Sequence, residues 1–358
     1  MLIFVVLLFV PILMQHLAVI DANINYKKKN QRAITAFFII LTLALMLRHE
    51  SVGYDTGNYI RYFEKISYMS WGEAAQYSVE LGFTFLTKIL SLISDSAHLF
   101  LAVVSLVTCA LMYPTYRRNC SDASLTIVLF CTMATFVMMF SGIRQMLAIS
   151  VGFLAYECTR KRKLWLFLLS VLAATLCHAS GLMLIFMYPI YYAKITKKWL
   201  KFVIPIMLSV FLFNEQIFFA LTYILSRFTK YDGVITQTGA YTMLILFTAF
   251  SVFSFIIPDE KKIDEETVGL RNFLLFALML QMFAPLHTIA MRMNYYYIIF
   301  IPLLIPRIIL CKRERWKQVA VTARYVMVAF FAVYFFISLG FGNNLGVFPY
   351  HFLWENVL

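Results

Sequence analysis

The sequence predicts an all-α protein, a polytopic membrane helical bundle. Of the 358 residues, 62% are hydrophobic and only 14% are charged, whereas a soluble domain carries about 25% charged residues. Apolar runs recur from end to end, and a run of about 17–25 residues is long enough to cross roughly 30 Å of hydrocarbon. A large soluble core does not explain this composition, because the surface of a soluble chain also grows with its length and must face water.

About twelve apolar segments qualify as transmembrane helices. They lie at 2–20, 33–47, 98–116, 122–140, 143–159, 164–180, 182–193, 199–221, 240–257, 271–288, 292–310 and 319–341. The weakest is 182–193, which is short and contains Pro189. No remaining stretch is long enough for a separate soluble domain, so residues 1–358 are expected to form a single integral membrane domain.

Clusters of basic residues between the helices set the expected orientation. They occur at 27–29, 117–118, 160–163, 194–201 and 312–317. Cytoplasmic loops are enriched in Lys and Arg, so we place these clusters inside. Alternation then leaves a minority of the 31 Lys and Arg residues outside, namely Arg48, Arg61, Lys65, Lys88, Arg144, Arg227, Lys230 and Arg292. The same pattern accounts for the net charge of +13 without nucleic acid as a partner.

Three connections follow from this topology. The first outer loop spans 48–97, and its amphipathic part near 80–93 is expected to lie as a helix at the membrane interface. A second outer loop, 222–240, is polar and rich in turn-forming residues. Residues 258–271 form an inner connector that mixes acidic and basic side chains.

Ionisable side chains from distant parts of the sequence fall on the same outer face. They are Arg48, Asp55, Glu80, Arg144, His178 and Arg292. A guanidinium is a planar fork that matches phosphate oxygens, while carboxylates and histidine transfer protons. This set predicts an outer pocket for an anionic substrate. Arg144 has an alternative role, because an arginine at membrane depth can instead extend to the headgroups or pair with Glu80 or Asp55.

Tyrosines accompany these charged groups. Tyr54 and Tyr59 lie in the first outer loop, and Tyr295 follows Arg292 by three positions, on the same helical face. Tyrosine can stack on a sugar ring while its hydroxyl forms hydrogen bonds, but an aromatic belt at the membrane interface needs no ligand. No DxD-like or histidine-rich cluster lies outside, so neither a metal nor another cofactor is expected.

Taken in chain order, these motifs resemble the EpsG-like group of Wzy-type polysaccharide polymerases. The residues that carry the resemblance are Arg48 with VGYDT at 52–56 and Tyr59, Glu80-x-Gly82-Phe83, SGIRQ at 141–145, HASG at 178–181, RMxYY at 292–296, and Pro349-Tyr350. The resemblance spans the whole chain in order and spacing.

The resemblance implies a glycosyltransferase-C-like membrane fold in the bacterial inner membrane, with an active site that faces the periplasm or exterior. The implied enzyme polymerises undecaprenyl-pyrophosphate-linked oligosaccharide repeat units into O-antigen, capsular or exopolysaccharide. A chain-length regulator protein is a further partner that the resemblance implies. A transporter or flippase of lipid-linked saccharides remains an alternative, because it would also present cations on the outer face. An O-antigen ligase-like transferase is a second alternative, because it would share the donor and differ only in the acceptor.

If the chain is such a polymerase, each outer residue has an expected role. Arg144 and Arg292, together with Arg48, would bind the pyrophosphate and stabilise its developing charge. Asp55 or Glu80 would accept the proton of the attacking hydroxyl, with His178 assisting either step. The expected sugar contacts are Tyr54, Tyr59 and Tyr295.

Overall fold

The computed structural model describes residues 1–17, 25–77, 80–195, 198–224, 240–286, 288–342 and 344–357. Over these ranges the chain is helical and contains no strand, only isolated β-bridges, so the predicted all-α fold is confirmed. Backbone contacts divide the chain into two compact units. Unit 1 comprises Met1–Ile185 and Val321–Leu358, and unit 2 comprises Phe186–Ala320. The predicted outer loop 222–240 lies outside the described residues, apart from its first three residues and its last.

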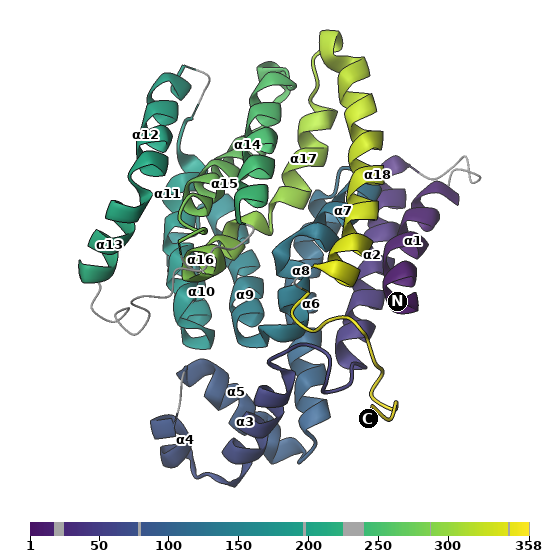
Figure 1. Ribbon diagram of the computed structural model, residues 1–358, viewed down its shortest axis with the longest axis vertical. Helices are drawn as coiled ribbons and strands as arrows, with labels where there is room; N and C mark the ends of the chain where they lie inside the picture. The colour runs from purple at the N-terminus through teal and green to yellow at the C-terminus, as the bar shows by residue number, and fades with distance from the viewer. Residues whose placement is uncertain are drawn as a thin grey trace. The chain divides into compact units, whose positions relative to one another are not determined.

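Unit 1 contains the first ten α-helices and most of α18 (Figure 1). These are α1 (Leu2–Leu17), α2 (Tyr26–Met46), α3 (Thr56–Tyr68), α4 (Trp71–Tyr77), α5 (Leu81–Ile93), α6 (Ala97–Asn119), α7 (Ala123–Thr132), α8 (Ala134–Ser141), α9 (Ile143–Arg160), α10 (Leu164–Cys177) and α18 (Lys317–Phe341), with most of the 3-10 helix η1 (Ala179–Phe186). Helix α9 packs against α6 and α10, and α2 packs against α1 and α6. Side chains cap several helices, as Ser96 does by accepting the Leu99 N–H at the start of α6.

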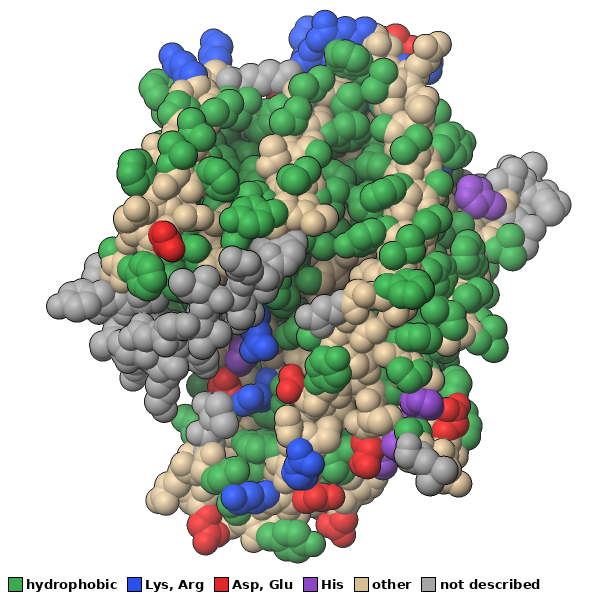
Figure 2. All heavy atoms as spheres, in the orientation of Figure 1, with side chains coloured by type: hydrophobic (Ala, Val, Ile, Leu, Met, Phe, Trp, Pro, Cys, Tyr) green, Lys and Arg blue, Asp and Glu red, His purple; other side chains and the backbone are tan. Residues whose placement is uncertain are grey.

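Helices α3, α4 and α5 form a separate layer at one end of unit 1, beyond the ends of α9 and α10 (Figure 1). Charged side chains gather over this layer, whereas the visible face of α18 is mainly hydrophobic (Figure 2). Helices α3 and α4 both pack on α5, and α5 in turn contacts α10. The layer thus connects the residues of the predicted first outer loop to the helical bundle.

Helix α5 buries polar side chains and exposes apolar ones. The buried polar residues face inward from the helix: Thr84, Thr87, Lys88 and Ser91. Lys88 Nζ donates to the carbonyl of Ser67 at 2.9 Å, at the C-terminal end of α3, where a cation is favourable. The exposed residues recur every three or four positions: Leu81, Phe85, Ile89 and Leu92. A continuous apolar stripe of this kind is typical of a helix that faces lipid.

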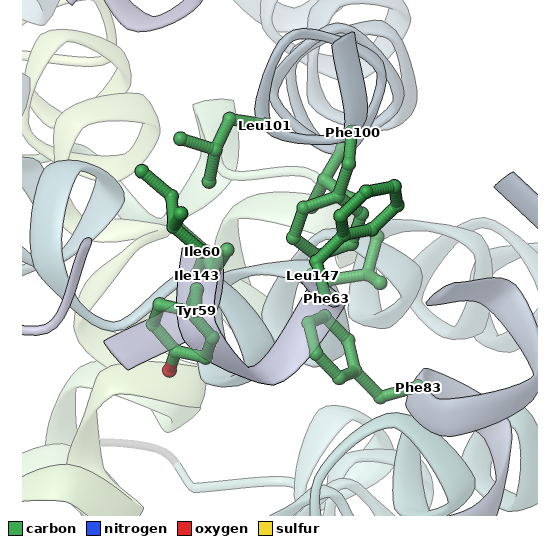
Figure 3. Packing of buried hydrophobic residues seen from close by; sticks show 9 residues of the cluster. Tyr59, Ile60, Phe63, Phe83, Phe100, Leu101, Ile143 and Leu147 are labelled. Atoms are coloured by element: carbon green, nitrogen blue, oxygen red, sulfur yellow. The ribbon is translucent and has the colours of Figure 1, made fainter. Parts of the chain in front are cut away.

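A hydrophobic cluster holds the α3–α5 layer to the bundle. Its buried side chains come from α3, α5, α6 and α9 (Figure 3): Tyr59, Ile60, Phe63, Phe83, Phe100, Leu101, Val104, Ile143 and Leu147. The rings of Phe63 and Phe100 stack with centroids 5.1 Å apart. Tyr59 is itself a predicted site residue, Phe83 follows Glu80 by three residues and Ile143 directly precedes Arg144. This packing therefore fixes the helices on which the site depends.

Residues 344–357, the C-terminal strap, run along the residues that follow α2. Gly53 N–H donates to Gly346 O at 2.8 Å, and Tyr54 N–H donates to Leu345 O at 2.9 Å. His49 N–H donates to His351 O, also at 2.9 Å, and the Tyr350 hydroxyl donates to Ala44 O. The strap therefore supplies backbone partners for the segment that leads to Asp55.

Unit 2 contains the remaining helices. They are α11 (Met187–Tyr192), α12 (Leu200–Leu212), α13 (Asn214–Ile224), α14 (Ala240–Ile256), α15 (Glu265–Gln281), α16 (Thr288–Ile298) and α17 (Ile301–Leu310), with the 3-10 helices η3 (Glu260–Lys262) and η4 (Glu314–Trp316). Helix α15 is central, since α11, α14, α16 and α17 all pack against it. It begins at Glu265, six residues before the predicted start of this span, because the Asp264 carboxylate caps it by accepting the Thr267 N–H at 2.8 Å.

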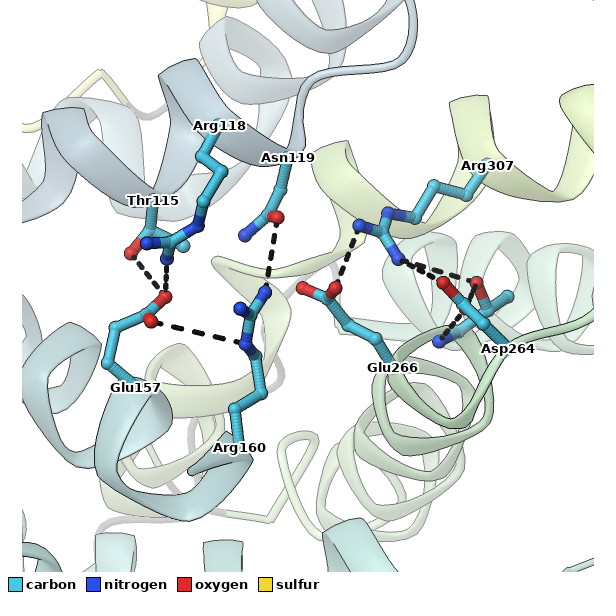
Figure 4. A network of polar contacts seen from close by, with 9 residues as sticks. Thr115, Arg118, Asn119, Glu157, Arg160, Asp264, Glu266 and Arg307 are labelled. Atoms are coloured by element: carbon cyan, nitrogen blue, oxygen red, sulfur yellow. Dashed lines mark hydrogen bonds and ion pairs between the residues drawn. The ribbon is translucent and has the colours of Figure 1, made fainter. Parts of the chain in front are cut away.

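Each unit also has its own polar network away from the predicted outer face (Figure 4). In unit 1, Glu157 pairs with Arg118 and accepts a hydrogen bond from Thr115. In unit 2, Arg307 pairs with Glu266 at 3.0 Å and with Asp264 at 3.6 Å. These networks occupy segments that the sequence places on the cytoplasmic side, where charged groups meet water and lipid headgroups.

Three predicted spans are bent in the structure. Helices α7 and α8 meet at 62°, the α12–α13 pair at 76° and the α16–α17 pair at 43°. In the last pair, Pro302 near the start of α17 removes a backbone donor and disfavours helical geometry before it. Among the described residues, two helices, Ala97–Asn119 and Glu314–Phe341, are long and apolar enough to cross a membrane, or up to five spans if each bent pair counts as one. The number of about twelve spans stays a prediction.

Candidate functional site

The site is built around Glu80, whose carboxylate contacts two other side chains. Arg144 NH1 donates to Glu80 Oε2 at 2.5 Å, and His178 Nδ1 lies 2.8 Å from Glu80 Oε1. The Glu80 side chain is only 8% exposed, while His178 remains 23% exposed. Three residues that are far apart in the sequence thus form one cluster, which we call the Glu80 cluster. Pairing with Glu80 was one alternative role predicted for Arg144, and the structure shows this pair.

Each member of the Glu80 cluster lies at a helix end. Glu80 immediately precedes α5 in an extended conformation and makes no capping hydrogen bond, which leaves its carboxylate directed elsewhere. Arg144 is the second residue of α9, after the break at Gly142 that separates α9 from α8. His178 follows the last residue of α10 in an extended conformation. At a helix end the backbone leaves the helical path, so a side chain there can point in directions that are closed to residues inside the helix. The three side chains can therefore converge.

Two glycines allow the helix ends to approach closely. A Cβ atom at Gly82 would lie 2.9 Å from the carbonyl carbon of Leu176, in the last turn of α10. A Cβ atom at Gly181 would lie 2.6 Å from the carbonyl carbon of Ala174. Real Cβ contacts are not this short, so any larger residue would push Glu80 or the segment after His178 away. Close packing therefore explains why glycine occupies positions 82 and 181, whatever chemical role the neighbouring residues have.

The electrostatics of the cluster keep Glu80 ionised. Burial, the largest influence, would by itself raise the pKa of Glu80, but the His178 hydrogen bond and the Arg144 charge together hold that pKa below its ordinary value. A carboxylate with a lowered pKa is a weak base at neutral pH. Glu80 is therefore better suited to orient His178 and Arg144 than to accept a proton itself.

Tyr59 lies beside the cluster and is only 9% exposed. Its ring centroid is 5.7 Å from the Arg144 guanidinium carbon, close enough for a cation–π contact. Burial raises the pKa of Tyr59, and the neighbouring Arg144 charge offsets this only in part, so the phenol stays neutral. Tyr59 thus supports the arginine and offers no free ring face to a sugar.

Asp55 makes a second contact between α3 and the end of α8. Its backbone N–H donates to Ser141 Oγ at 3.3 Å, and the Ser141 hydroxyl donates to Asp55 Oδ2 at 3.2 Å. Gly53, at φ +90°, lies against the Phe140 carbonyl where a Cβ atom would come within 2.4 Å of the oxygen. Because Ser141 is three residues before Arg144, this contact places Asp55 next to the same helix junction that carries the arginine.

Arg48 is buried beneath the C-terminal strap and is 1% exposed. Its NH1 donates to Leu45 O at 2.8 Å, whereas its Nε and NH2 have no hydrogen-bond acceptor among the described residues. Burial lowers the pKa of Arg48 to about 10, so the group is still charged at neutral pH. In this conformation the Arg48 side chain is not exposed at the surface.

The remaining predicted residues lie elsewhere. Tyr54 is exposed, with its ring against Gly346 of the strap. Arg292 and Tyr295 belong to α16 of unit 2, where Arg292 is exposed and Tyr295 is buried. The structure therefore joins Glu80, Arg144 and His178 in one cluster, with Asp55 and Tyr59 beside it, and does not bring Arg48 to it.

Sequence analysis did not select Tyr62 and Thr84. The Tyr62 hydroxyl lies 2.6 Å from Thr84 Oγ1, and Thr84 donates to the Glu80 carbonyl at 2.9 Å. Thr84 follows Glu80 by four residues, the spacing at which a helical hydroxyl bonds back to a carbonyl. That spacing was visible in the sequence, but the pairing with Tyr62 depends on how α3 packs on α5. Within the described residues, no group of three His, Cys, Asp or Glu side chains could hold a metal ion.

One comparison with known proteins gives a match. The model of the EpsG family matches residues 31–352, which includes every site residue described above. No curated protein and no solved structure matches the chain.

Proposed function

Since the chain belongs to the EpsG family, we propose that it is a membrane glycosyltransferase that polymerises lipid-linked oligosaccharide repeat units. Its substrate is the undecaprenyl-pyrophosphate-linked repeat unit of an O-antigen, capsular polysaccharide or exopolysaccharide, and the reaction takes place on the outer face of the bacterial inner membrane. The observation that carries this proposal is the Glu80 cluster, in which an arginine suited to pyrophosphate lies beside a histidine suited to proton transfer.

Arg144 binds the pyrophosphate of the donor. Its side chain is 26% exposed, so the accessible part of the guanidinium can donate to a phosphate oxygen. A guanidinium held at a fixed position stabilises the negative charge that develops on a leaving pyrophosphate. Glu80 and Tyr59 hold the guanidinium in place before the substrate arrives, so little reorganisation is needed.

His178 activates the acceptor hydroxyl. When Nδ1 donates its proton to Glu80, Nε2 becomes the unprotonated nitrogen and can accept a proton. The hydroxyl oxygen of the acceptor sugar attacks the anomeric carbon of the donor while its proton passes to Nε2. The bond from that carbon to the pyrophosphate oxygen breaks, and the electron pair leaves with the lipid pyrophosphate. Glu80 stabilises the imidazolium that forms.

The other predicted residues have supporting roles in this proposal. Asp55, hydrogen-bonded to Ser141, is the second candidate for the base. Arg292 belongs to unit 2, and its expected role in binding the pyrophosphate stays a prediction. Arg48 would join it only after the strap moves, because the side chain is buried at present. The reaction needs no metal, and a chain-length regulator protein would act on the polymer that forms.

A gel-ladder assay tests the proposal. Purified protein in nanodiscs is mixed with lipid-pyrophosphate-linked repeat units from the same organism, with EDTA and without nucleotide sugar. The expected product is a ladder of multiples of one repeat unit, which a flippase would not make. A product that appears only when a lipid A acceptor is added would instead identify a ligase and overturn the polymerase proposal.

Arg144 variants connect this activity to the cluster. Arg144→Ala is expected to lower turnover about 100-fold, because it removes a fixed charge that stabilises the leaving group. Arg144→Lys retains a cation but not the planar fork and should lose less. Arg61→Ala is the matched control, since Arg61 is an exposed arginine of α3 that bonds Asn58 at 2.7 Å and lies outside the cluster. Equal turnover in the three variants, at equal amounts of folded protein, would rule out the proposed role of Arg144.

A further inference from the structure

Two tyrosines next to the Glu80 cluster form a stacked pair that is exposed at Tyr77. Tyr62 of α3 and Tyr77 at the end of α4 stack with ring centroids 6.1 Å apart and an interplanar angle of 26°. Tyr77 is 43% exposed, and Tyr62 is partly buried. The Tyr62 ring also packs against Phe83, with centroids 6.1 Å apart, so the exposed part of the pair is mainly the Tyr77 ring.

This pair is tied to the catalytic groups through Tyr62. The Tyr62 hydroxyl contacts Thr84 at 2.6 Å, and Thr84 bonds the carbonyl of Glu80. Burial raises the pKa of Tyr62, while the charges of Arg144 and Glu80 act on the same hydroxyl in opposite directions. Both charges are therefore close to this ring, and a ligand on the tyrosine pair would lie beside the Glu80 cluster.

Lys65 gives the surface a polar group. Its Nζ lies 4.1 Å from the centroid of the Tyr77 ring, and its side chain is exposed. An ammonium donates up to three hydrogen bonds, and it is attracted to an aromatic face when no better acceptor is present. An apolar face with a few polar donors at its edge is the usual composition of a site that binds a small ligand.

Based on this geometry, we propose that Tyr62 and Tyr77 form a platform for a pyranose ring of the substrate oligosaccharide, with Lys65 donating to its hydroxyl or carboxylate groups. The proposal rests on the proposed function and makes it more specific. It replaces two of the predicted sugar contacts, because Tyr59 and Tyr295 are buried and offer no face to a ligand. A sugar ring can lie on tyrosine with its C–H groups, while the Tyr77 hydroxyl bonds to water or to the sugar.

Equilibrium binding separates the sugar from the rest of the substrate. The first probe is the oligosaccharide of the repeat unit, released from its carrier by mild acid and labelled with a fluorophore at its reducing end. The second probe is undecaprenyl phosphate, which carries no sugar. Tyr77→Ala is expected to weaken saccharide binding roughly tenfold, which corresponds to about 1.4 kcal/mol, and to leave binding of undecaprenyl phosphate unchanged. Tyr77→Phe keeps the ring and should bind the saccharide nearly as well as the wild-type protein.

Tyr68→Ala is the matched control, because Tyr68 is the exposed tyrosine at the end of α3 and lies outside the stacked pair. Saccharide affinity that is unchanged in Tyr77→Ala, or lowered equally in Tyr68→Ala, would overturn the platform. These measurements distinguish a failure of the platform proposal from a failure of the polymerase proposal. If the wild-type protein makes a ladder and Tyr77→Ala has an unchanged KM, only the platform is wrong. If no ladder forms but the saccharide binds through Tyr77, only the polymerase proposal is wrong.

Discussion

Glu80 shows how the chemistry of a residue depends on its neighbours. Taken alone, a carboxylate on the outer face is a candidate base. In the structure, one oxygen accepts from Arg144 and the other lies within hydrogen-bonding distance of His178. Both contacts favour the ionised form and hold the pKa of Glu80 below its ordinary value. In the proposed mechanism the carboxylate therefore positions the other two side chains, and His178 accepts the proton.

His178 and Glu80 variants should separate these roles. His178→Ala is expected to lower kcat about 100-fold or more, since it removes the group that accepts the proton. Glu80→Gln retains a hydrogen-bond acceptor for Nδ1–H and should lower kcat less, because it removes only the charge that supports the imidazolium. Single-turnover assays with saturating donor measure both effects. A larger loss in Glu80→Gln than in His178→Ala would identify Glu80 as the base.

The cluster should also make stability depend on pH. The pKa of Glu80 is lower in the folded protein than its ordinary value of about 4.3 in an unfolded chain. Its contribution to the free energy of unfolding is therefore complete above that ordinary value, and it is lost as the pH falls through the lowered folded value. The difference in thermal unfolding temperature between the wild-type protein and Glu80→Gln should be largest near neutral pH and should shrink in acid.

Glu64→Gln provides the comparison for that experiment, because Glu64 is an exposed carboxylate on α3. It should unfold at nearly the same temperature as the wild-type protein across the pH range. If the gap between wild type and Glu80→Gln stayed constant with pH, the ion pair with Arg144 would not contribute to the stability of the folded state.

The individual residues show what sequence could and could not predict. Alternation of spans predicted Glu80, Arg144 and His178 on one face, and an Arg144–Glu80 pair was one of the alternatives. The contact of His178 with Glu80 could not be predicted, since it depends on the close approach allowed by Gly82 and Gly181. The burial of Arg48 was also unpredictable, because the strap that covers it comes from the far end of the chain.

Helix α5 buries polar side chains and exposes apolar ones, and this arrangement leads to a prediction about its surroundings. Its buried face carries Thr84, Thr87 and Lys88, while its exposed face is an apolar stripe. In water this arrangement would be unfavourable, since each buried methylene is worth about 0.8 kcal/mol and here the apolar side is the one left open. We therefore expect the exposed stripe of α5 to face the lipid of the outer leaflet.

A spin label at Ile89→Cys tests this expectation. In nanodiscs it should be accessible to molecular oxygen, which dissolves in lipid, and protected from a water-soluble nickel chelate. A label at Glu64→Cys, on the exposed polar side of α3, should show the reverse. Strong accessibility of the Ile89 position to the nickel chelate would mean that α5 faces water.

At the level of helices, the apolar pattern predicted where the helices lie better than it predicted where they break. Segments 2–20, 98–116 and 143–159 correspond closely to α1, α6 and α9. The run 122–140 contains no glycine or proline, so no helix-breaking residue predicts the break at Met133 between α7 and α8. That break allows α8 to end at Ser141 and α9 to begin before Arg144, and the Asp55–Ser141 contact depends on it.

The expected orientation of the chain can be tested on unit 1. The C-terminal strap bonds to residues of the first outer loop, so both must lie on one side of the membrane. In a background without native cysteines, Ser51→Cys and Glu355→Cys should both react with a membrane-impermeant maleimide added outside. Lys161→Cys should react only after the membrane is permeabilised. Reaction of Lys161→Cys from outside would reverse the orientation, and a difference between the other two would contradict the strap.

Composition predicted that the whole molecule is a helical membrane protein, but it did not fix the number of membrane spans. Few charged residues and recurring apolar runs identified a membrane protein of helices. The number of spans is harder to obtain, because several apolar helices are shorter than a full crossing and others are bent. Hydropathy measures how apolar a segment is, but it does not record whether the helix bends within the membrane.

The strap also has a consequence for how the protein is made. The segment that leads to Asp55 is translated early, but its backbone partners at Gly346 and Leu345 are translated only after α18. A nascent chain can therefore insert its first helices without completing the loop beside the Glu80 cluster. The proposed activity would therefore arise only at the end of synthesis, and a chain released early by the ribosome would be anchored in the membrane without it.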